Sequence, residues 1–299
     1  MKFYKTFTLA LFIFSMPFTE VFANDSFAII GDAGVWNRSA QKVRNSILKS
    51  SIRSLVIPGD NLYDESENYA SVWKHWSGKG FKFDVVAIGN HNNGYQNEMN
   101  YFAMPSENYS KKVGSTRFIV LNSDNQNNLS SVKGWLDKTL KEVSEKTIFI
   151  VMHHPPVDIT RRHVWTDKEQ FHRVIFPIIQ KYRHKLTALI VGHDHIASLH
   201  TIDGLPMIVS GAVFQPIPTV PFNYVSQERG LFVQTRWLFQ KAAYWVRLDV
   251  DPANGNVWVN YVNVDDDRVD CSALISGKRL LLKTNCYKTT AAGTKISLE

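Results

Sequence analysis

The run Phe27-Ala28-Ile29-Ile30 leads directly into Gly31-Asp32-Ala33-Gly34 near the start of the chain. A short apolar run that ends in turn residues is typical of a buried β-strand. The same arrangement recurs further along, with polar clusters that follow apolar runs: Gly59-Asp60-Asn61-Leu62-Tyr63 after 54–57, Gly89-Asn90-His91 after 85–88, His153-His154-Pro155-Pro156 after 148–152, and Gly192-His193-Asp194-His195 after 188–191.

Amphipathic segments alternate with these runs. Apolar residues recur at helical spacing over 39–48, 132–143 and 167–182, and two further apolar runs at 118–121 and 207–209 indicate strands. Alternation of strand and helix predicts parallel strand pairing with the helices outside the sheet.

The end of the chain has a different pattern. Alternating residues at 243–250 and 256–264 flank turn residues at 251–255, which predicts an antiparallel hairpin. No internal repeat, low-complexity linker or composition break divides the 299 residues, so we expect a single α/β domain.

The polar clusters suit one chemical task. Ligands bind beyond the carboxyl ends of strands in open α/β sheets, so the clusters should converge. Their carboxylates, amide oxygen and imidazoles form an oxygen and nitrogen ligand set for two divalent or trivalent ions, without thiolates. A glycine precedes four of the clusters, and we expect these glycines to let the backbone turn sharply off each strand.

The first 23 residues have the pattern of a secretory signal peptide. A basic start, Met1-Lys2-Phe3-Tyr4-Lys5, precedes an apolar stretch over 6–18 and a small-residue cleavage site at Val21-Phe22-Ala23. We expect residues 1–23 to be removed, and the domain over 24–299 to be exported to the periplasm or the extracellular space. The alternative is an uncleaved anchor, although the apolar stretch is shorter than the roughly 20 residues that span a bilayer. No later segment predicts a membrane span.

The two cysteines, Cys271 and Cys286, lie beyond all the polar clusters. In an exported protein they predict a disulfide that staples the C-terminal segment; two free buried thiols are the alternative. Their distance along the chain from the histidines argues against a cysteine hydrolase, and the absence of Gly-x-Ser-x-Gly argues against a common class of serine hydrolase.

The net charge of +7 is spread in pairs such as Lys111-Lys112 and Arg161-Arg162. A nucleic-acid surface usually has a denser basic run interleaved with aromatic residues, so no nucleic-acid partner is expected. The charge suits a small anionic substrate. The sequence leaves the oligomeric state open.

The order of the clusters resembles that of the calcineurin-like metallophosphoesterases. The first motif of that superfamily is usually Asp-x-His, whereas this chain has Asp32-Ala33-Gly34, and its second motif continues to Tyr63. These two departures are similar to the purple acid phosphatases, and the resemblance covers residues 27–215. It implies an α/β fold in which two mixed β-sheets pack as a sandwich flanked by helices.

The resemblance also implies a set of metal ligands. Asp32, Tyr63 and His195 would bind a first metal, iron(III). Asn90, His153 and His193 would bind a second, which is iron(II), zinc or manganese, and Asp60 would bridge the two. His154 also fits the fourth motif if the frame shifts by one residue, but the pattern Ile150-Val151-Met152-His153 favours His153.

Two more histidines resemble residues of the family that contact the substrate. His91 follows Asn90, and His163 lies ten residues beyond His153, where a surface-loop histidine is the alternative. The family implies hydrolysis of phosphate monoesters by attack of a metal-bound hydroxide on phosphorus. A phosphodiesterase or nucleotide hydrolase of the same superfamily is the alternative, and a non-catalytic binding protein on this scaffold is a further one.

Overall fold

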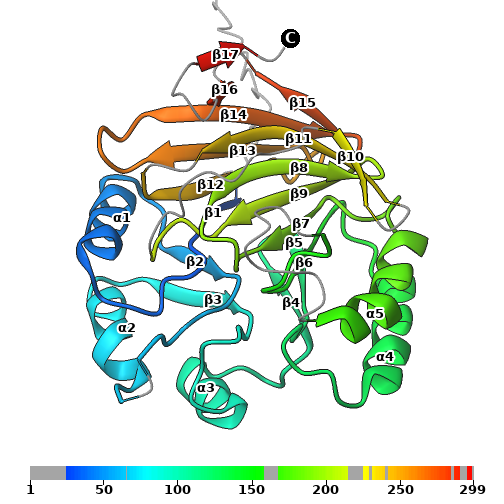
Figure 1. Ribbon diagram of the computed structural model, residues 1–299, viewed down its shortest axis with the longest axis horizontal. Coiled ribbons are helices and arrows are strands. Elements are labelled where there is room, and N and C mark those ends of the chain that lie inside the picture. The colour runs from blue at the N-terminus through cyan, green and yellow to red at the C-terminus, as the bar shows by residue number, and fades with distance from the viewer. Residues whose placement is uncertain are drawn as a thin grey trace, which may run out of the picture.

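Two β-sheets with helices on their outer faces make up the computed structural model (Figure 1). It describes residues 25–64, 66–157, 168–214, 225–228, 231–239, 242–283, 286–289 and 295–297. The predicted signal segment and His163 lie outside these ranges. No helix within them is both long and apolar enough to span a bilayer.

The first sheet has seven strands in the order β15-β14-β13-β12-β1-β2-β3. Their bounds are β1 (Asp25–Ile29), β2 (Ser54–Ile57), β3 (Lys82–Val86), β12 (Tyr244–Val250), β13 (Val257–Asn263), β14 (Val269–Ser276) and β15 (Arg279–Leu282). Strands β1, β2 and β3 are parallel, as predicted. The β12–β13 hairpin is antiparallel, also as predicted, and β12 joins β1 across the sheet.

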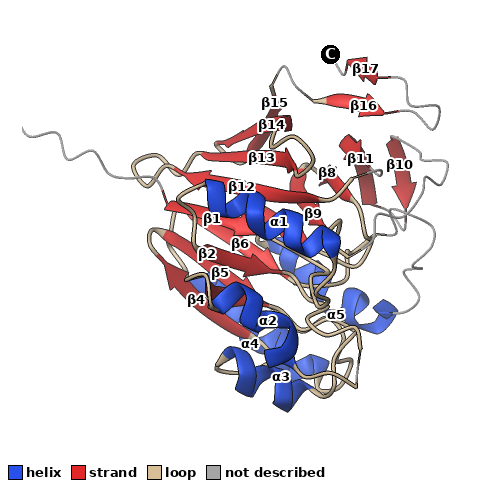
Figure 2. Cartoon of the chain, turned by 90° about the vertical axis from the view of Figure 1, so that its left-hand side faces the viewer, coloured by secondary structure: helices blue, strands red, loops and turns tan. Residues whose placement is uncertain are grey.

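The second sheet has eight strands in the order β10-β11-β8-β9-β7-β6-β5-β4. They are β4 (Tyr109–Val113), β5 (Thr116–Val120), β6 (Thr147–Val151), β7 (Ala188–Val191), β8 (Ala197–Ile202), β9 (Leu205–Ser210), β10 (Val225–Glu228) and β11 (Leu231–Phe239). Its central strands β5, β6, β7 and β9 are parallel. A two-stranded hairpin, β16 (Tyr287–Thr289) and β17 (Lys295–Ser297), lies beside β11 at one end of the molecule (Figure 2).

The five helices of the described chain divide between the sheets: α1 (Arg38–Lys49), α2 (Tyr69–Ser77) and α3 (Tyr95–Phe102) pack with the first sheet, and α4 (Leu129–Glu142) and α5 (Glu169–Lys181) with the second (Figure 1). Alternation along β6 explains this layering. Phe149 and Val151 belong to the core between the sheets, whereas Ile148 and Ile150 belong to the core beneath α4 and α5. The expected sandwich flanked by helices is therefore confirmed.

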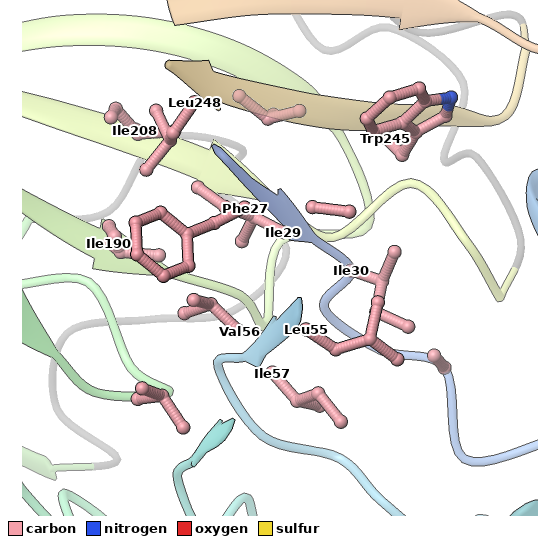
Figure 3. Close-up of a cluster of buried hydrophobic side chains, with 14 of the residues drawn as sticks. Phe27, Ile29, Ile30, Leu55, Val56, Ile57, Ile190, Ile208, Trp245 and Leu248 are labelled. Atoms are coloured by element: carbon pink, nitrogen blue, oxygen red, sulfur yellow. The ribbon is translucent and has the colours of Figure 1, made fainter. Parts of the chain in front are cut away.

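The core between the sheets is built from aromatic and branched side chains. Phe27 of β1 meets Phe118 of β5 edge to face, with ring centroids 5.1 Å apart. Phe27 also lies near Ile190, Ile208 and Leu248, which come from three other strands (Figure 3). Packing of these side chains holds the two sheets together. It therefore also sets the relative positions of their strand ends.

The predicted disulfide is present between Cys271, in β14, and Cys286, which precedes β16. The bond closes a loop with a sequence separation of 15. Loop closure of this size contributes about 3 kcal/mol to stability in the chain-entropy model. The bond therefore holds the C-terminal segment to β14, next to the edge strand of the first sheet.

A buried polar network joins the loops that follow β2 and β3. Glu98 of α3 is fully buried and accepts hydrogen bonds from Asn61 Nδ2 and, at 3.3 Å, from the Tyr69 hydroxyl. Asn61 also donates to the Ala87 carbonyl, at 2.9 Å. The Tyr69 hydroxyl in turn accepts from the Asn93 backbone N–H, at 3.4 Å. Glu98 thereby connects the two loops from one side.

Glu98 should make the protein less stable as the pH rises. Burial raises the pKa of Glu98 to about 8, above its ordinary value of 4.5. The folded state then holds a proton that the unfolded state releases, so stability falls between pH 4.5 and 8. Glu98→Gln mimics the protonated acid and does not titrate, so this loss of stability with rising pH should be absent from the variant. From pH 5 to pH 8 the variant should gain about 4 kcal/mol relative to the parent, at about 1.4 kcal/mol per pH unit.

Urea denaturation of both proteins at several pH values measures this difference. Glu142→Gln, at an exposed position at the end of α4, is the matched control and should leave the pH dependence unchanged. Parallel curves for Glu98→Gln and the parent would contradict a protonated Glu98.

Candidate metal centre

The polar clusters predicted from the sequence all lie beyond the carboxyl ends of their strands, and they converge. Four of the predicted ligands adopt left-handed backbone: Asp32, Asp60, His193 and His195, with φ of 56°, 55°, 70° and 46°. This conformation is costly for residues other than glycine, and it clusters at functional sites. The turns off the strands are therefore made by the predicted ligands themselves.

The expectation for the glycines was only partly correct. Of the four that precede clusters, Gly59 alone has a positive φ, at 100°. The other three lie where an added Cβ would come within 3.0 Å of a neighbouring atom. Their main role is thus close approach between loops.

One group of ligand atoms comes from Asp32, Tyr63 and His195. The Tyr63 hydroxyl lies 3.2 Å from Asp32 Oδ1 and 2.9 Å from His195 Nε2, and these last two atoms are 3.5 Å apart. The backbone N–H of His193 donates to both Asp32 oxygens and fixes that carboxylate. These are the residues assigned to the first metal by resemblance.

A second group comes from Asn90, His153 and His193. Asn90 Oδ1 lies 3.1 Å from both His153 Nε2 and His193 Nδ1, and the two ring nitrogens are 3.2 Å apart. These are the residues assigned to the second metal. Ligand atoms that share one ion at 2.0–2.2 Å in octahedral geometry are separated by about 3 Å, so the spacing suits one cation.

Asp60 lies between the groups. Its Oδ1 is 3.1 Å from His153 Nε2, of the second group, and its carboxylate also contacts the Tyr63 hydroxyl, of the first. The backbone N–H of His91 donates to the same oxygen, at 3.0 Å. This is the position that a bridging carboxylate would need.

The chemistry of the second group requires a cation. His153 Nδ1 lies 2.9 Å from the Pro58 carbonyl, and a proton on that nitrogen leaves Nε2 with a lone pair. This lone pair meets Asn90 Oδ1 and a carboxylate oxygen of Asp60, neither of which can donate. A metal ion, or a proton on the ring, would resolve the mismatch. The residues present thus fit a metal site.

The electrostatics agree with this interpretation. Burial lowers the pKa of His153, but the carboxylates of Asp60 and Asp32 outweigh that effect and raise it to about 9. Burial would raise the pKa of Asp60, yet the neighbouring His153 holds it below its usual range. The buried carboxylates therefore stabilise positive charge in the site.

His154 occupies a different environment from His153. It is buried, and its Nδ1 lies 2.8 Å from the Ser123 hydroxyl, which also accepts from the His154 backbone N–H at 3.0 Å. Among the described residues the Nε2 of His154 has no hydrogen-bond partner, and its ring lies 4.5 Å from that of His193. His154 can form a three-histidine group with His153 and His193. Of the two adjacent histidines, however, it is His153 that lies within 3.1 Å of Asn90 Oδ1 and Asp60 Oδ1. The geometry favours His153 as the ligand.

Two histidines, His91 and His163, were predicted to contact the substrate. His91 is exposed, with its ring 4.6 Å from that of Tyr63. His163 lies outside the described residues. Sequence reasoning missed two neighbours of the site, Ser123 after β5 and Phe214 after β9, because neither belongs to a cluster of ligand-type residues.

Known proteins resemble this chain in sequence and in fold. A curated relative, the probable glycerophosphodiester phosphodiesterase GpdQ of Arcobacter nitrofigilis, is 26% identical over 122 residues, which are 35% of this chain and 44% of the relative. The match thus spans less than half of that protein.

Two solved structures share the fold. Purple acid phosphatase PPD1 from yellow lupin seeds has a TM-score of 0.65 at 16% identity, over 85% of this chain and 54% of that one. GAP50, the anchor in the inner membrane complex of Plasmodium, has a TM-score of 0.64 at 14% identity, over 88% and 90%. At these identities the likeness concerns the fold alone.

The family assignment rests on a longer match. A model of the calcineurin-like phosphoesterase family matches residues 26–197, which is more than half of the chain and includes all seven predicted metal ligands. The chain belongs to the calcineurin-like phosphoesterases.

Proposed function

We propose that this protein is an exported two-metal acid phosphatase that hydrolyses phosphate monoesters. The observation that carries the proposal is the position of Tyr63, whose hydroxyl lies within 3.2 Å of both Asp32 Oδ1 and His195 Nε2. A phenol in a ligand set distinguishes the purple acid phosphatase pattern from that of other members of the superfamily.

Tyr63 also limits the choice of the first metal. Burial raises the pKa of its phenol well above the ordinary value, and the carboxylates of Asp32 and Asp60 raise it further. Only an ion of high charge would stabilise the phenolate in such surroundings. Iron(III) meets this requirement better than zinc or manganese(II), and Asn90, His153 and His193 would hold iron(II), zinc or manganese beside it.

The bound metals would supply an acidified water and positive charge for an in-line displacement at phosphorus. The chain's own residues orient that chemistry. Pro58 fixes the tautomer of His153, and the N–H groups of His193 and His91 fix Asp32 and Asp60. With their geometry set before substrate arrives, these ligands need little reorganisation during the reaction.

His91 is suited to handle the substrate. It is exposed and lies next to Asn90 and Tyr63, so its ring is accessible to a phosphate bound beside these residues. An imidazole there can donate a hydrogen bond to a phosphoryl oxygen or a proton to the leaving alkoxide. We assign His91 this role and propose the same for His163.

A phosphodiesterase is the second candidate, favoured by the similarity to the GpdQ protein. Two observations support the monoesterase instead: the absence of a histidine after Asp32, and the place of Tyr63 in the first group. Export is supported by the pattern of residues 1–23 and by the disulfide, since disulfides persist in oxidising compartments.

The first prediction concerns colour. Purified, iron-replete protein should show a visible absorption band from a tyrosinate-to-iron(III) transition, and Tyr63→Phe should abolish it. Tyr182→Phe, at the end of α5, is the matched control and should keep the band. A colourless parent that contains iron, or a band that survives in Tyr63→Phe, would show the first-metal assignment to be wrong.

The second prediction concerns the substrate class. The value of kcat/KM for an aryl phosphate monoester at acid pH should exceed that for a bis-aryl diester by at least tenfold, about 1.4 kcal/mol of transition-state discrimination. Turnover of both compounds at acid and neutral pH measures the ratio. A preference for the diester at both pH values would replace the proposal with the phosphodiesterase.

The third prediction separates the adjacent histidines. Removal of a direct ligand should cost more than loss of an outer partner, which typically costs about 10–100-fold. His153→Ala should therefore lose the second metal and reduce kcat/KM by more than about 100-fold. His154→Ala should keep two metals and lose about tenfold. Metal analysis of both variants decides the assignment, and the reverse result would identify His154 as the ligand.

A further inference from the structure

The chain runs close to the first group of predicted ligands as it leaves β9. At Gly211 an added Cβ would lie 2.7 Å from Asp32 Oδ2 and 2.8 Å from the backbone nitrogen of His195, so this backbone is in contact with the site. The buried residues Ala212 and Val213 follow, and then Phe214, which is partly buried. A further strand end thus contributes to the site, but it contributes an aromatic ring.

The Phe214 ring contacts two of the three residues in the first group. It stacks on Tyr63 with ring centroids 4.1 Å apart and an interplanar angle of 12°. It also meets His195 edge to face, with centroids 5.3 Å apart and an angle of 78°. Both geometries are favourable for aromatic pairs, which typically gain about 0.5–1.5 kcal/mol each.

Phe214 is itself held in place. Its carbonyl accepts a hydrogen bond from Asn37 Nδ2, at 3.0 Å. The other atom of that amide, Asn37 Oδ1, accepts from the Ala40 backbone N–H at 2.9 Å and caps α1. One side chain therefore ties Phe214 to the N-terminus of a helix on the first sheet.

We propose that Phe214 is a positioning residue for the first metal, and that its ring fixes the orientation of the Tyr63 phenol and the His195 imidazole. The reason is geometric: the hydroxyl contacts of Tyr63 restrain one end of its ring, whereas stacking restrains the plane. A ligand whose rotamer is locked by packing binds its ion more tightly than one that must be ordered on binding. The inference rests on the proposed two-metal function.

The ring also affects the surroundings of the phenol oxygen. Loss of Phe214 would open one side of Tyr63 to water, and hydrogen bonds from water would stabilise the phenolate. A more stable phenolate donates charge to iron(III) less readily, so the visible band should move to shorter wavelength. This readout reports on Tyr63 itself and not on general stability.

The experiment compares Phe214→Leu, Phe214→Tyr and the parent in two measurements. In Phe214→Leu we expect a band at shorter wavelength and loss of the first metal to a chelator about tenfold faster. Phe214→Tyr keeps an aromatic ring and should restore both properties. Phe232→Leu, at a Phe that is 46% exposed on β11, is the matched control and should behave as the parent.

The outcomes separate this inference from the proposed function. If Phe214→Leu keeps the parent's band and rate of metal loss, Phe214 does not position the ligands. If the parent itself has no band, the iron(III) assignment fails, and the rate of metal loss alone decides the role of Phe214. Faster loss in both Phe214→Leu and Phe214→Tyr would show that general packing, and not an aromatic ring, is responsible.

Discussion

Side-chain atoms that can bind a cation are held close together at the carboxyl ends of the strands. Asn90 Oδ1, His153 Nε2 and His193 Nδ1 lie within 3.2 Å of one another, and Asp60 Oδ1 is 3.1 Å from the same His153 nitrogen. Four of the seven predicted ligands, Asp60 and His193 among them, also adopt left-handed backbone, at a typical cost of about 1–3 kcal/mol each. Such an arrangement persists only if the rest of the molecule enforces it, which is the role of the two packed sheets.

Much of the sandwich follows from local sequence. The apolar runs that end in glycine or histidine predicted the parallel strands, because burial on both faces selects continuous apolar residues. The prediction missed α2, although the apolar residues of this helix recur at helical spacing and could have indicated it. In α3 the pattern fails for a physical reason, since one of its buried positions is Glu98. The pairing of β1 with β12, between residues as distant as Asp25 and Val250, has no local signal.

The candidate site was predictable to the extent that its members are ligand-type residues. The strand ends supplied seven such positions, and the structure brings all of them together. The choice between His153 and His154 depends on which ring faces Asn90 and which faces Ser123, and side-chain direction at the end of a strand is set by tertiary contacts. Phe214 could not be predicted, because an apolar residue that stacks on a ligand has the same local pattern as one that packs in the core.

The two departures from the usual superfamily motif are consequences of one packing constraint. The loop after Asp32 and the loop from Asp60 to Tyr63 are joined by backbone hydrogen bonds, in which the Gly34 N–H donates to the Asp60 carbonyl and the Tyr63 N–H donates to the Gly34 carbonyl. A Cβ at Gly34 would lie 2.3 Å from the backbone nitrogen of Leu62 and 2.4 Å from the carbonyl carbon of Asn61.

A histidine at position 34, as in the usual Asp-x-His motif, would therefore force these loops apart. Because Tyr63 belongs to the second loop, the same displacement would draw its hydroxyl away from Asp32 and His195. A chain of this fold can place a histidine after the first aspartate or a tyrosine beside it, but it cannot do both with the loops in this position. The absence of the histidine and the presence of the phenol are thus a single structural feature. The close approach of the two loops is what brings the Tyr63 hydroxyl beside Asp32 and His195.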